Sequence, residues 1–390
     1  MTTQAFSCDI FCNVIDNYGD IGVCWRLARQ LANEHGITVR LWVDDQESFC
    51  RLYPEADASL AQQHCRGVEV RHWTAPFPEV EPANLVIETF ACKLPQSYIE
   101  AMAAQQQSVW INLEYLSAEE WVAGCHKLPS PHPGLPLTKY FFFPGFTPQT
   151  GGLLLERDLL ARRDAFWNDA AQQQAFWQSL GMDMPSAETL RISLFGYEND
   201  ALSGLFDAWA AGMQPVLCLV PEGRILPQTG QYFGDAAPRA GSSYVRGKLR
   251  VRVLPFVGQE RYDELLWACD VNFVRGEDSC VRAQWAARPF VWQIYPQHDA
   301  VHWNKLQAFL KLYQAPLSQL AAQAVQGLWR AWNEENGAGN AWPAFAAARG
   351  EVDHHAQGWV RQLAASNLAL NLLDFYRKIG TMRAFKIEGQ

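Results

Sequence analysis

The stretch VNFVRGEDSCVRAQWAARPF, residues 271–290, has residue types and spacing suited to binding an anion. Its pattern predicts a buried strand, a tight turn over 275–279, a helix from Cys280 and the start of another strand. Gly276 allows the backbone to approach a ligand closely, and Ser279 is expected to be the N-cap of the helix. Free N–H groups at such a helix start favour phosphate.

Charged side chains occupy the same turn: Arg275, Glu277 and Asp278. Two carboxylates beside a phosphate would repel it, so we expect them to hold sugar or ribose hydroxyls, or a cationic partner. Phosphate together with a polyol indicates a nucleotide sugar. The alternative is an ordinary strand–helix turn whose charges are solvated.

A second acidic loop, DNYGDIG, follows a strand candidate at residues 8–15. Active sites in open α/β sheets lie at the carboxyl ends of strands. The carboxylates of Asp16 and Asp20, four residues apart, therefore predict a catalytic or cation-binding site, unless Asp20 simply caps the following helix. Further candidates for donor or acceptor contacts in this loop are Asn17, Gly19 and Gly22.

Aromatic residues recur near the predicted strand ends of the second half of the chain. Phe195, Tyr197, Phe256 and Tyr295 are in such positions, where a ring can stack on a nucleobase. Each ring alone is more typical of a core residue than of a ligand contact. Their placement at one rim is what favours a ligand.

These candidate residues need α/β elements to position them. Strands are predicted at 37–43, 68–73, 85–90 and 108–116, and a second series of strands and helices begins at 191. Two consecutive doubly wound domains, followed by helices after Ala300, are expected. The strand ends ETFAC and NLEYLSAEEW carry polar residues, which mark the ligand-facing rim of the first sheet.

Composition excludes several classes of protein. The 390 residues carry a net charge of −9 and are 49% hydrophobic, which argues against a nucleic-acid binder and for a globular protein. The ten cysteines form no CxxC pair, and neither a secretory leader nor a membrane-length apolar run is visible, so a cytoplasmic protein without a membrane partner is expected. Zinc spacing, GxSxG, the Walker motif and GxGxxG are absent.

With both loops in view, the sequence resembles the EarP family of bacterial protein-arginine rhamnosyltransferases, which modify elongation factor P. The matching motifs run in family order over most of the chain. They are FCNVIDNYGDIGVCWRLARQL, VIETFAC, INLEYLSAEEW, KYFFFPGF with TGGLLLERD, LFGY, and VRGEDSCVRAQWAARPFVWQIYPQ.

The resemblance implies a GT-B glycosyltransferase, an α/β fold of two Rossmann-like domains facing a cleft, with C-terminal helices returning to the first domain. The expected divisions are 1–180 for acceptor binding, 181–355 for the nucleotide sugar, and 356–390 for the returning helical segment. The implied reaction transfers L-rhamnose from dTDP-β-L-rhamnose to an arginine of elongation factor P with inversion. It supports translation of polyproline stretches. No metal or other cofactor is implied.

Residue roles follow the same resemblance. Asp20 matches the general base or guanidine-activating residue, Asp16 the residue that helps to orient the acceptor, and Glu277 an essential glutamate of the donor loop. Carboxylates suit this chemistry, because a guanidinium is a poor nucleophile with a pKa above about 12. The donor pocket is implied to comprise Phe195, Tyr197, Phe256, Gln259, Arg275, Gly276, Asp278, Ser279 and Tyr295.

Two rival interpretations remain from the sequence. One is a GT-B enzyme with the same kind of donor but a small-molecule or glycan acceptor. The other is a non-catalytic protein that senses a nucleotide sugar or binds a translation factor. Retention of both acidic loops argues against the second, and turnover of the donor distinguishes it from an enzyme.

Overall fold

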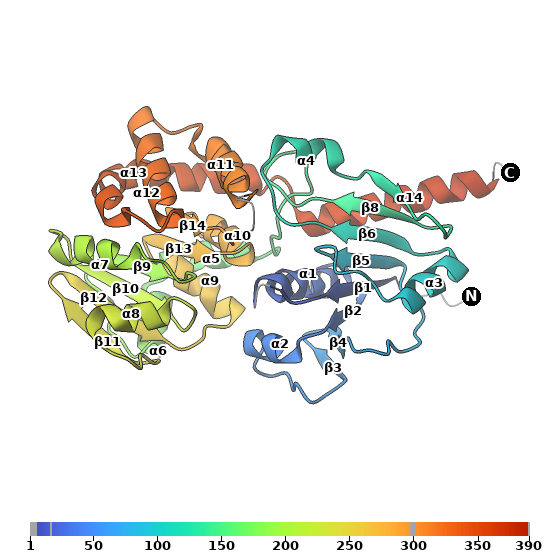
Figure 1. Ribbon diagram of the computed structural model, residues 1–390, viewed down its shortest axis with the longest axis horizontal. Coiled ribbons are helices and arrows are strands. Elements are labelled where there is room, and N and C mark those ends of the chain that lie inside the picture. The colour runs from blue at the N-terminus through green and yellow to red at the C-terminus, as the bar shows by residue number, and fades with distance from the viewer. Residues whose placement is uncertain (1–5, 16–17, 297–300, 389–390) are drawn as a thin grey trace. The chain divides into compact units, whose positions relative to one another are not determined.

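A computed structural model describes residues 6–15, 18–296 and 301–388 of the chain. It divides into two compact units (Figure 1). The first unit comprises Met1–Arg157 and Leu363–Gln390, and the second comprises Asp158–Gln362. Each unit is built around its own mainly parallel sheet, which confirms the expected α/β class with two doubly wound domains.

In the described part of the first unit, eight strands form a sheet in the order β3-β4-β2-β1-β5-β6-β8-β7. All neighbouring pairs are parallel except β3 with β4 and β7 with β8, at the two edges. The strands are β1 Ser7–Cys12, β2 Thr38–Val43, β3 Gln62–Cys65, β4 Val68–His72, β5 Leu85–Thr89, β6 Val109–Leu113, β7 Pro129–Pro131 and β8 Thr138–Phe142.

Helices cover this first sheet. They are α1 Gly19–His35, α2 Gln46–Leu52, α3 Gln96–Gln105, α4 Glu120–Cys125 and α14 Leu368–Glu388. Helix α1 buries an apolar face that includes Cys24, Trp25 and Leu31, as its 3.6-residue periodicity predicts. It ends at Gly36, whose left-handed φ of 66° lets its N–H bond the Ala32 carbonyl.

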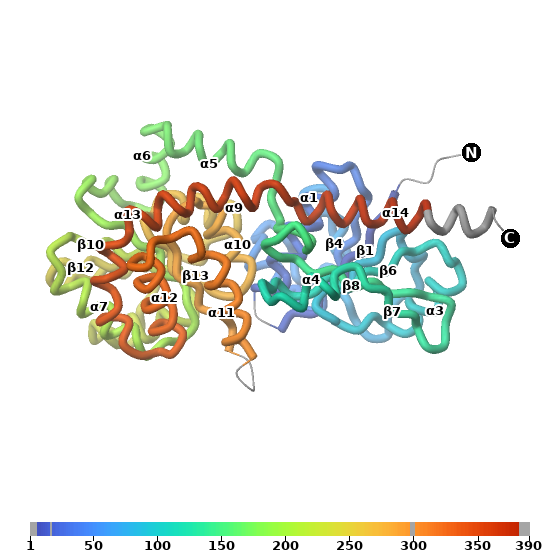
Figure 2. Tube along the Cα trace, turned by 90° about the horizontal axis from the view of Figure 1, so that it is seen from above, coloured from blue at the N-terminus to red at the C-terminus, as the bar shows by residue number. Residues whose placement is uncertain are grey.

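The C-terminal helix α14 belongs to the first unit, as expected. It contacts α1 and β6 within that unit (Figure 2). The Asn371 side chain donates to the Gly151 carbonyl at 3.0 Å. Gly152, with φ of 77°, lies so close to Ser366 that a Cβ would be 2.5 Å from the Ser366 carbonyl oxygen. The paired glycines therefore let two distant backbone segments meet.

In the described part of the second unit, six strands are ordered β11-β12-β10-β9-β13-β14, with only β11 antiparallel to its neighbour. The strands are β9 Leu190–Leu194, β10 Val216–Pro221, β11 Ser243–Arg246, β12 Leu249–Leu254, β13 Val271–Arg275 and β14 Phe290–Gln293. The helices are α5 Leu159–Asn168, α6 Ala170–Ser179, α7 Leu202–Ala211, α8 Leu226–Phe233, α9 Gln259–Ala268, α10 Asp278–Trp285, α11 Val301–Gln314, α12 Gln319–Asn333 and α13 Ala338–Leu363.

The unit boundaries lie at 157/158 and 362/363, whereas the sequence analysis placed them at 180/181 and 355/356. Helix α5 packs on α9, and the indole N–H of Trp167 donates to the Trp267 carbonyl at 2.9 Å. Near the other boundary, the Trp359 indole N–H donates to the Gln284 side chain at 2.8 Å. Tertiary contacts of α5, α6 and the end of α13 therefore assign these helices to the second unit.

Candidate active site

The Asp20 carboxylate lies at the carboxyl end of the central strand β1. Tyr18, not Asp20, is the N-cap of α1, and Asp20 lies in the first helical turn. The Asp20 side chain is buried, 3% exposed, and its Oδ2 accepts the Ile15 backbone N–H at 2.8 Å. The carboxylate is therefore turned back toward the strand-end loop, and it does not serve as the helix N-cap.

Of the other predicted loop residues, Asp16 and Asn17 fall outside the described residues. Gly19 is the first residue of α1, and the Gly22 N–H donates to the Tyr18 carbonyl at 2.9 Å. Both glycines are thus part of the first helical turn, next to Asp20.

Asp44, after the adjacent strand β2, binds the residues that directly follow β1. Its carboxylate accepts the Val14 backbone N–H at 2.9 Å and a hydrogen bond from the Asn13 amide. Sequence reasoning did not assign Asp44 a role, although its place after a strand was a usable signal. The loop is therefore held by two carboxylates, Asp44 at residues 13 and 14 and Asp20 at residue 15.

The loops after β5 and β6 contribute an aromatic pair at this same edge of the sheet. The Phe90 and Tyr115 rings stack with centroids 4.4 Å apart and planes 13° from parallel. Phe90, Ala91 and Lys93 all have φ of 55°, and the Asn112 side chain accepts the Ala91 N–H at 3.1 Å. Left-handed non-glycine residues persist only where their surroundings hold them, so this loop has a defined conformation.

In the second unit, the structure brings the predicted donor-pocket residues to one edge of the sheet. Each follows the carboxyl end of a parallel strand, or ends it, as topology requires of a ligand site in such folds. Phe195 and Tyr197 follow β9, Phe256 and Gln259 follow β12, Arg275 ends β13 and leads into Gly276, Asp278 and Ser279, and Tyr295 follows β14.

Arg275 is held between two of the predicted aromatic residues. Its guanidinium carbon lies 4.5 Å from the Phe195 ring centre and 4.7 Å from that of Tyr197, a cation–π arrangement. Arg275 is only 6% exposed, and its Nη1 has no hydrogen-bond partner among the described residues. A buried, unsatisfied guanidinium nitrogen is costly, so this position is suited to an anionic ligand.

Ser279 has a different role from the one expected. Helix α10 begins at Asp278, and its N-cap is Glu277, whose side chain makes no capping hydrogen bond. The Ser279 hydroxyl instead accepts the Arg275 N–H at 3.0 Å and donates to the Arg275 carbonyl. Ser279 thus closes the turn through its side chain. Gly276 has φ of 59°, a conformation that favours glycine.

Glu277 lies at the start of α10 with an electrostatic partner that the sequence did not reveal. The Lys305 ammonium of α11 lies 3.8 Å from its carboxylate, and both side chains are about four-fifths buried, with 17% exposure for Lys305 and 21% for Glu277. The two residues are far apart in the sequence and share no motif, so no local signal could have paired them. Lys305 offsets the charge of Glu277 and orients it.

Two further residues at this edge were missed. The buried Gln293 side chain accepts the Tyr197 backbone N–H at 2.8 Å, and thereby fixes one aromatic segment to the end of β14. Tyr262 of α9 packs edge-on against Phe195, with ring centres 5.6 Å apart. Both lie within apolar sequence patterns that indicate core residues.

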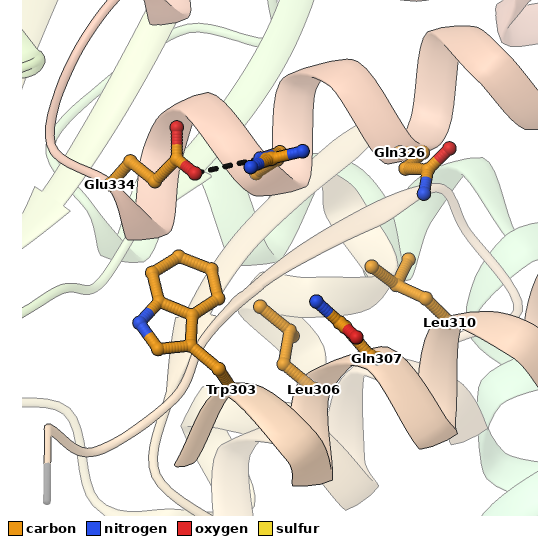
Figure 3. Close-up of a pocket in the computed structure, with 7 residues that line it drawn as sticks. Trp303, Leu306, Gln307, Leu310, Gln326 and Glu334 are labelled. Carbon is orange, nitrogen blue, oxygen red and sulfur yellow. Dashed lines mark hydrogen bonds and ion pairs between the residues drawn. The ribbon is translucent and has the colours of Figure 1, made fainter. Parts of the chain in front are cut away.

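A groove elsewhere in the second unit contains none of the predicted site residues. It encloses about 270 Å³ and is lined by Trp303, Leu306, Gln307, Leu310, Gln326, Arg330 and Glu334 (Figure 3). Among the residues that the structure describes, no group of three or more His, Cys, Asp or Glu side chains is arranged to hold a metal ion. Within the same residues, no helix has the length and apolar character needed to span a membrane.

Known proteins match this chain over most of its length. The model of the family described as elongation-factor P (EF-P) rhamnosyltransferase EarP matches residues 8–377. A protein-arginine rhamnosyltransferase of Pseudomonas putida KT2440 is 55% identical, over 95% of this chain and 98% of its own. The protein of the same name from Pseudomonas aeruginosa PAO1 is 50% identical, again over 95% and 98%.

Solved structures of glycosyltransferases also match this chain, and they show which fold it has. A structure determined for EarP-mediated arginine glycosylation of translation elongation factor EF-P is 41% identical, covers 95% of this chain and 99% of its own, and has a TM-score of 0.69. MurG of Acinetobacter baumannii, at 12% identity and a TM-score of 0.51 over 96% of this chain and 100% of its own, shares the fold alone. The fold is that of GT-B glycosyltransferases, and the chain belongs to the EarP family of protein-arginine rhamnosyltransferases.

Proposed function

We propose that the protein transfers L-rhamnose from dTDP-β-L-rhamnose to an arginine of elongation factor P, with inversion at the anomeric carbon. The family description and the matched EarP structure name this acceptor for those proteins, and the relatives are named for arginine and rhamnose. Modification of the factor would support translation of polyproline stretches. A translation factor works in the cytoplasm, which agrees with the location expected from the sequence.

The donor half of the proposal rests on one observation, the buried Arg275 with its Nη1 unpartnered among the described residues, at the carboxyl edge of the second sheet. A diphosphate oxygen would satisfy this nitrogen with a charge-assisted hydrogen bond. The N-terminus of α10 lies on the same turn and favours the same negative charge. Both groups would stabilise the leaving diphosphate, so we propose a reaction that needs no metal ion.

The nucleoside is proposed to use the remaining aromatic surface. Phe195 and Tyr197 each direct one face to Arg275. Tyr295 is 38% exposed and lies edge-on to Tyr197, with ring centres 5.5 Å apart. Tyr295 and Phe256 are therefore better candidates for contact with thymine than Phe195 and Tyr197. Asp278 and Gln259 are candidates for contact with sugar hydroxyls.

The acceptor half is assigned to the first unit. Asp20 is proposed to bind the arginine guanidinium and to take a proton from the attacking nitrogen, with Asp16 orienting the same group. That nitrogen then bonds to C1 of rhamnose. The bond from C1 to the diphosphate oxygen breaks, and its electron pair leaves with dTDP. Attack from the face opposite dTDP gives the inverted, α-linked product.

Glu277 is proposed to take part in the same reaction, held in position by Lys305. As an anion at the donor turn, it can contact a hydroxyl of rhamnose or the acceptor cation.

Release of dTDP, measured in a coupled assay, tests the substrate pair. The proposal requires fast release from dTDP-β-L-rhamnose only when elongation factor P is present. Release at the same rate with and without the factor would refute a protein acceptor. No release with the factor present would refute the substrate pair.

A further inference from the structure

The hydroxyl of Tyr262 is a buried polar group that the reaction outlined above does not use. Tyr262 lies on α9, is 7% exposed, and its hydroxyl has no hydrogen-bond partner among the described residues. The Arg275 Nη1, at the same edge of the sheet, also lacks a partner there. The Tyr262 ring packs edge-on to Phe195, and the Arg275 guanidinium lies over that same ring. Two unsatisfied groups therefore flank one aromatic side chain.

Arg275 cannot supply the acceptor that the Tyr262 hydroxyl lacks, and the phenol oxygen, which could accept a hydrogen bond from Arg275, does not do so in the structure. A guanidinium only donates hydrogen bonds. Burial raises the pKa of Tyr262, the nearby Ser279 hydroxyl and Arg275 oppose this shift, and the Asp278 and Asp263 carboxylates add to it. The phenol is thus protonated at neutral pH and has a hydrogen to donate. Two buried donors that make no hydrogen bond to the described residues are suited to a ligand rich in acceptor oxygens.

We propose that the Tyr262 hydroxyl donates a hydrogen bond to a phosphate oxygen of the nucleotide donor, beside the contact made by Arg275. This inference rests on the proposed nucleotide-sugar donor and adds a residue to its binding site. Phosphate is favoured over a ribose hydroxyl because the neighbouring groups are a guanidinium and the N-terminus of α10, which both favour an anion. Tyr262 thereby becomes a determinant of affinity for the diphosphate.

The structure offers a matched control in Tyr313 of α11. Its hydroxyl is equally buried and also has no partner among the described residues. Tyr313 packs against the rings of Phe290, Trp329 and Trp359, which include none of the proposed donor-pocket residues. Tyr313→Phe therefore makes the same chemical change at the same burial, away from the proposed phosphate.

The experiment compares the full-length wild type with Tyr262→Phe and Tyr313→Phe. Affinity for dTDP is measured by calorimetry and affinity for thymidine by NMR titration. Loss of one hydrogen bond to a charged group predicts that Tyr262→Phe binds dTDP about tenfold to a hundredfold more weakly. Its thymidine affinity should be unchanged, and Tyr313→Phe should match the wild type for both ligands. The melting temperature of ligand-free Tyr262→Phe should stay the same or rise, because a buried hydroxyl without a described partner is removed.

Each contrary result overturns a defined part of the inference. Unchanged dTDP affinity in Tyr262→Phe would overturn the contact. An equal loss of thymidine affinity would move the contact to the nucleoside and overturn the phosphate assignment. A lower melting temperature without ligand would show that the hydroxyl serves the fold. Failure of the wild type to bind dTDP at all would overturn the proposed donor, and this inference with it.

Discussion

Substitution of Asp20 by asparagine separates the catalytic role of this carboxylate from its structural role. Asparagine has the same shape, and its side-chain oxygen can still accept the Ile15 N–H that Asp20 accepts at 2.8 Å. The fold then loses one negative charge in the first turn of α1, which costs about 0.3–1 kcal/mol. The asparagine amide cannot take a proton from a guanidinium. Loss of a general base slows a reaction by roughly 10²–10⁴-fold, or about 3–5 kcal/mol of barrier.

The assay is a single turnover with saturating dTDP-β-L-rhamnose and elongation factor P, followed by mass spectrometry. Asp20→Asn should slow transfer at least about a hundredfold. Affinity for dTDP should be unchanged, since Arg275 and the N-terminus of α10, which are proposed to bind the diphosphate, lie in the second unit. Asp45→Asn is the matched control. Asp45 follows β2 at the same sheet edge, but its carboxylate caps α2 by accepting the Ser48 N–H, a role that asparagine also fills.

Wild-type turnover by Asp20→Asn would refute the assignment of Asp20 as the group that activates the acceptor. An equal rate loss in Asp45→Asn would show that the change of charge at this edge, rather than the chemistry of Asp20, slows transfer.

Three further predictions concern the donor turn, metal ions and pH. Glu277→Ala should remove most activity, whereas near-normal turnover would reduce Glu277 to a residue of the helix start. Incubation with EDTA should leave the rate unchanged, because Arg275 and the N-terminus of α10 are proposed to stabilise the diphosphate, and a rate restored only by added Mg²⁺ would contradict this. Burial, assisted by Lys127, lowers the pKa of His126 from 6.5 to about 4. The unfolded chain therefore binds more protons between these values, and stability should fall as pH drops from 6.5 to 4. His126→Asn should show a weaker pH dependence of its melting temperature. An unchanged pH dependence would show that His126 is not the group whose protonation lowers the stability.

Much of the fold was predictable because its signals are local. The alternation of apolar strands with amphipathic helices indicated two doubly wound units, and Gly36 marked the end of α1, where the structure has a left-handed residue. The carboxyl-edge position of Phe195, Tyr295 and Arg275 follows from the strand pattern. Parallel strands bring their carboxyl ends to one side of a sheet.

What the sequence did not reveal depends on tertiary contacts. Ser279 was expected to cap a helix because serine favours that position, but the helix begins two residues earlier than predicted, at Asp278, and the Ser279 hydroxyl closes the turn. Lys305 meets Glu277 only when α11 packs near α10. Tyr262 occupies an apolar helix position, and only the folded structure shows that its hydroxyl is buried without a described partner.

The most direct test of the proposed reaction is the intact mass of purified elongation factor P after incubation with this protein and dTDP-β-L-rhamnose. We predict a gain of one deoxyhexose, which fragmentation places on an arginine side chain. An unmodified factor, with binding of dTDP-β-L-rhamnose demonstrated in the same sample, would contradict the proposed acceptor and leave the donor site intact.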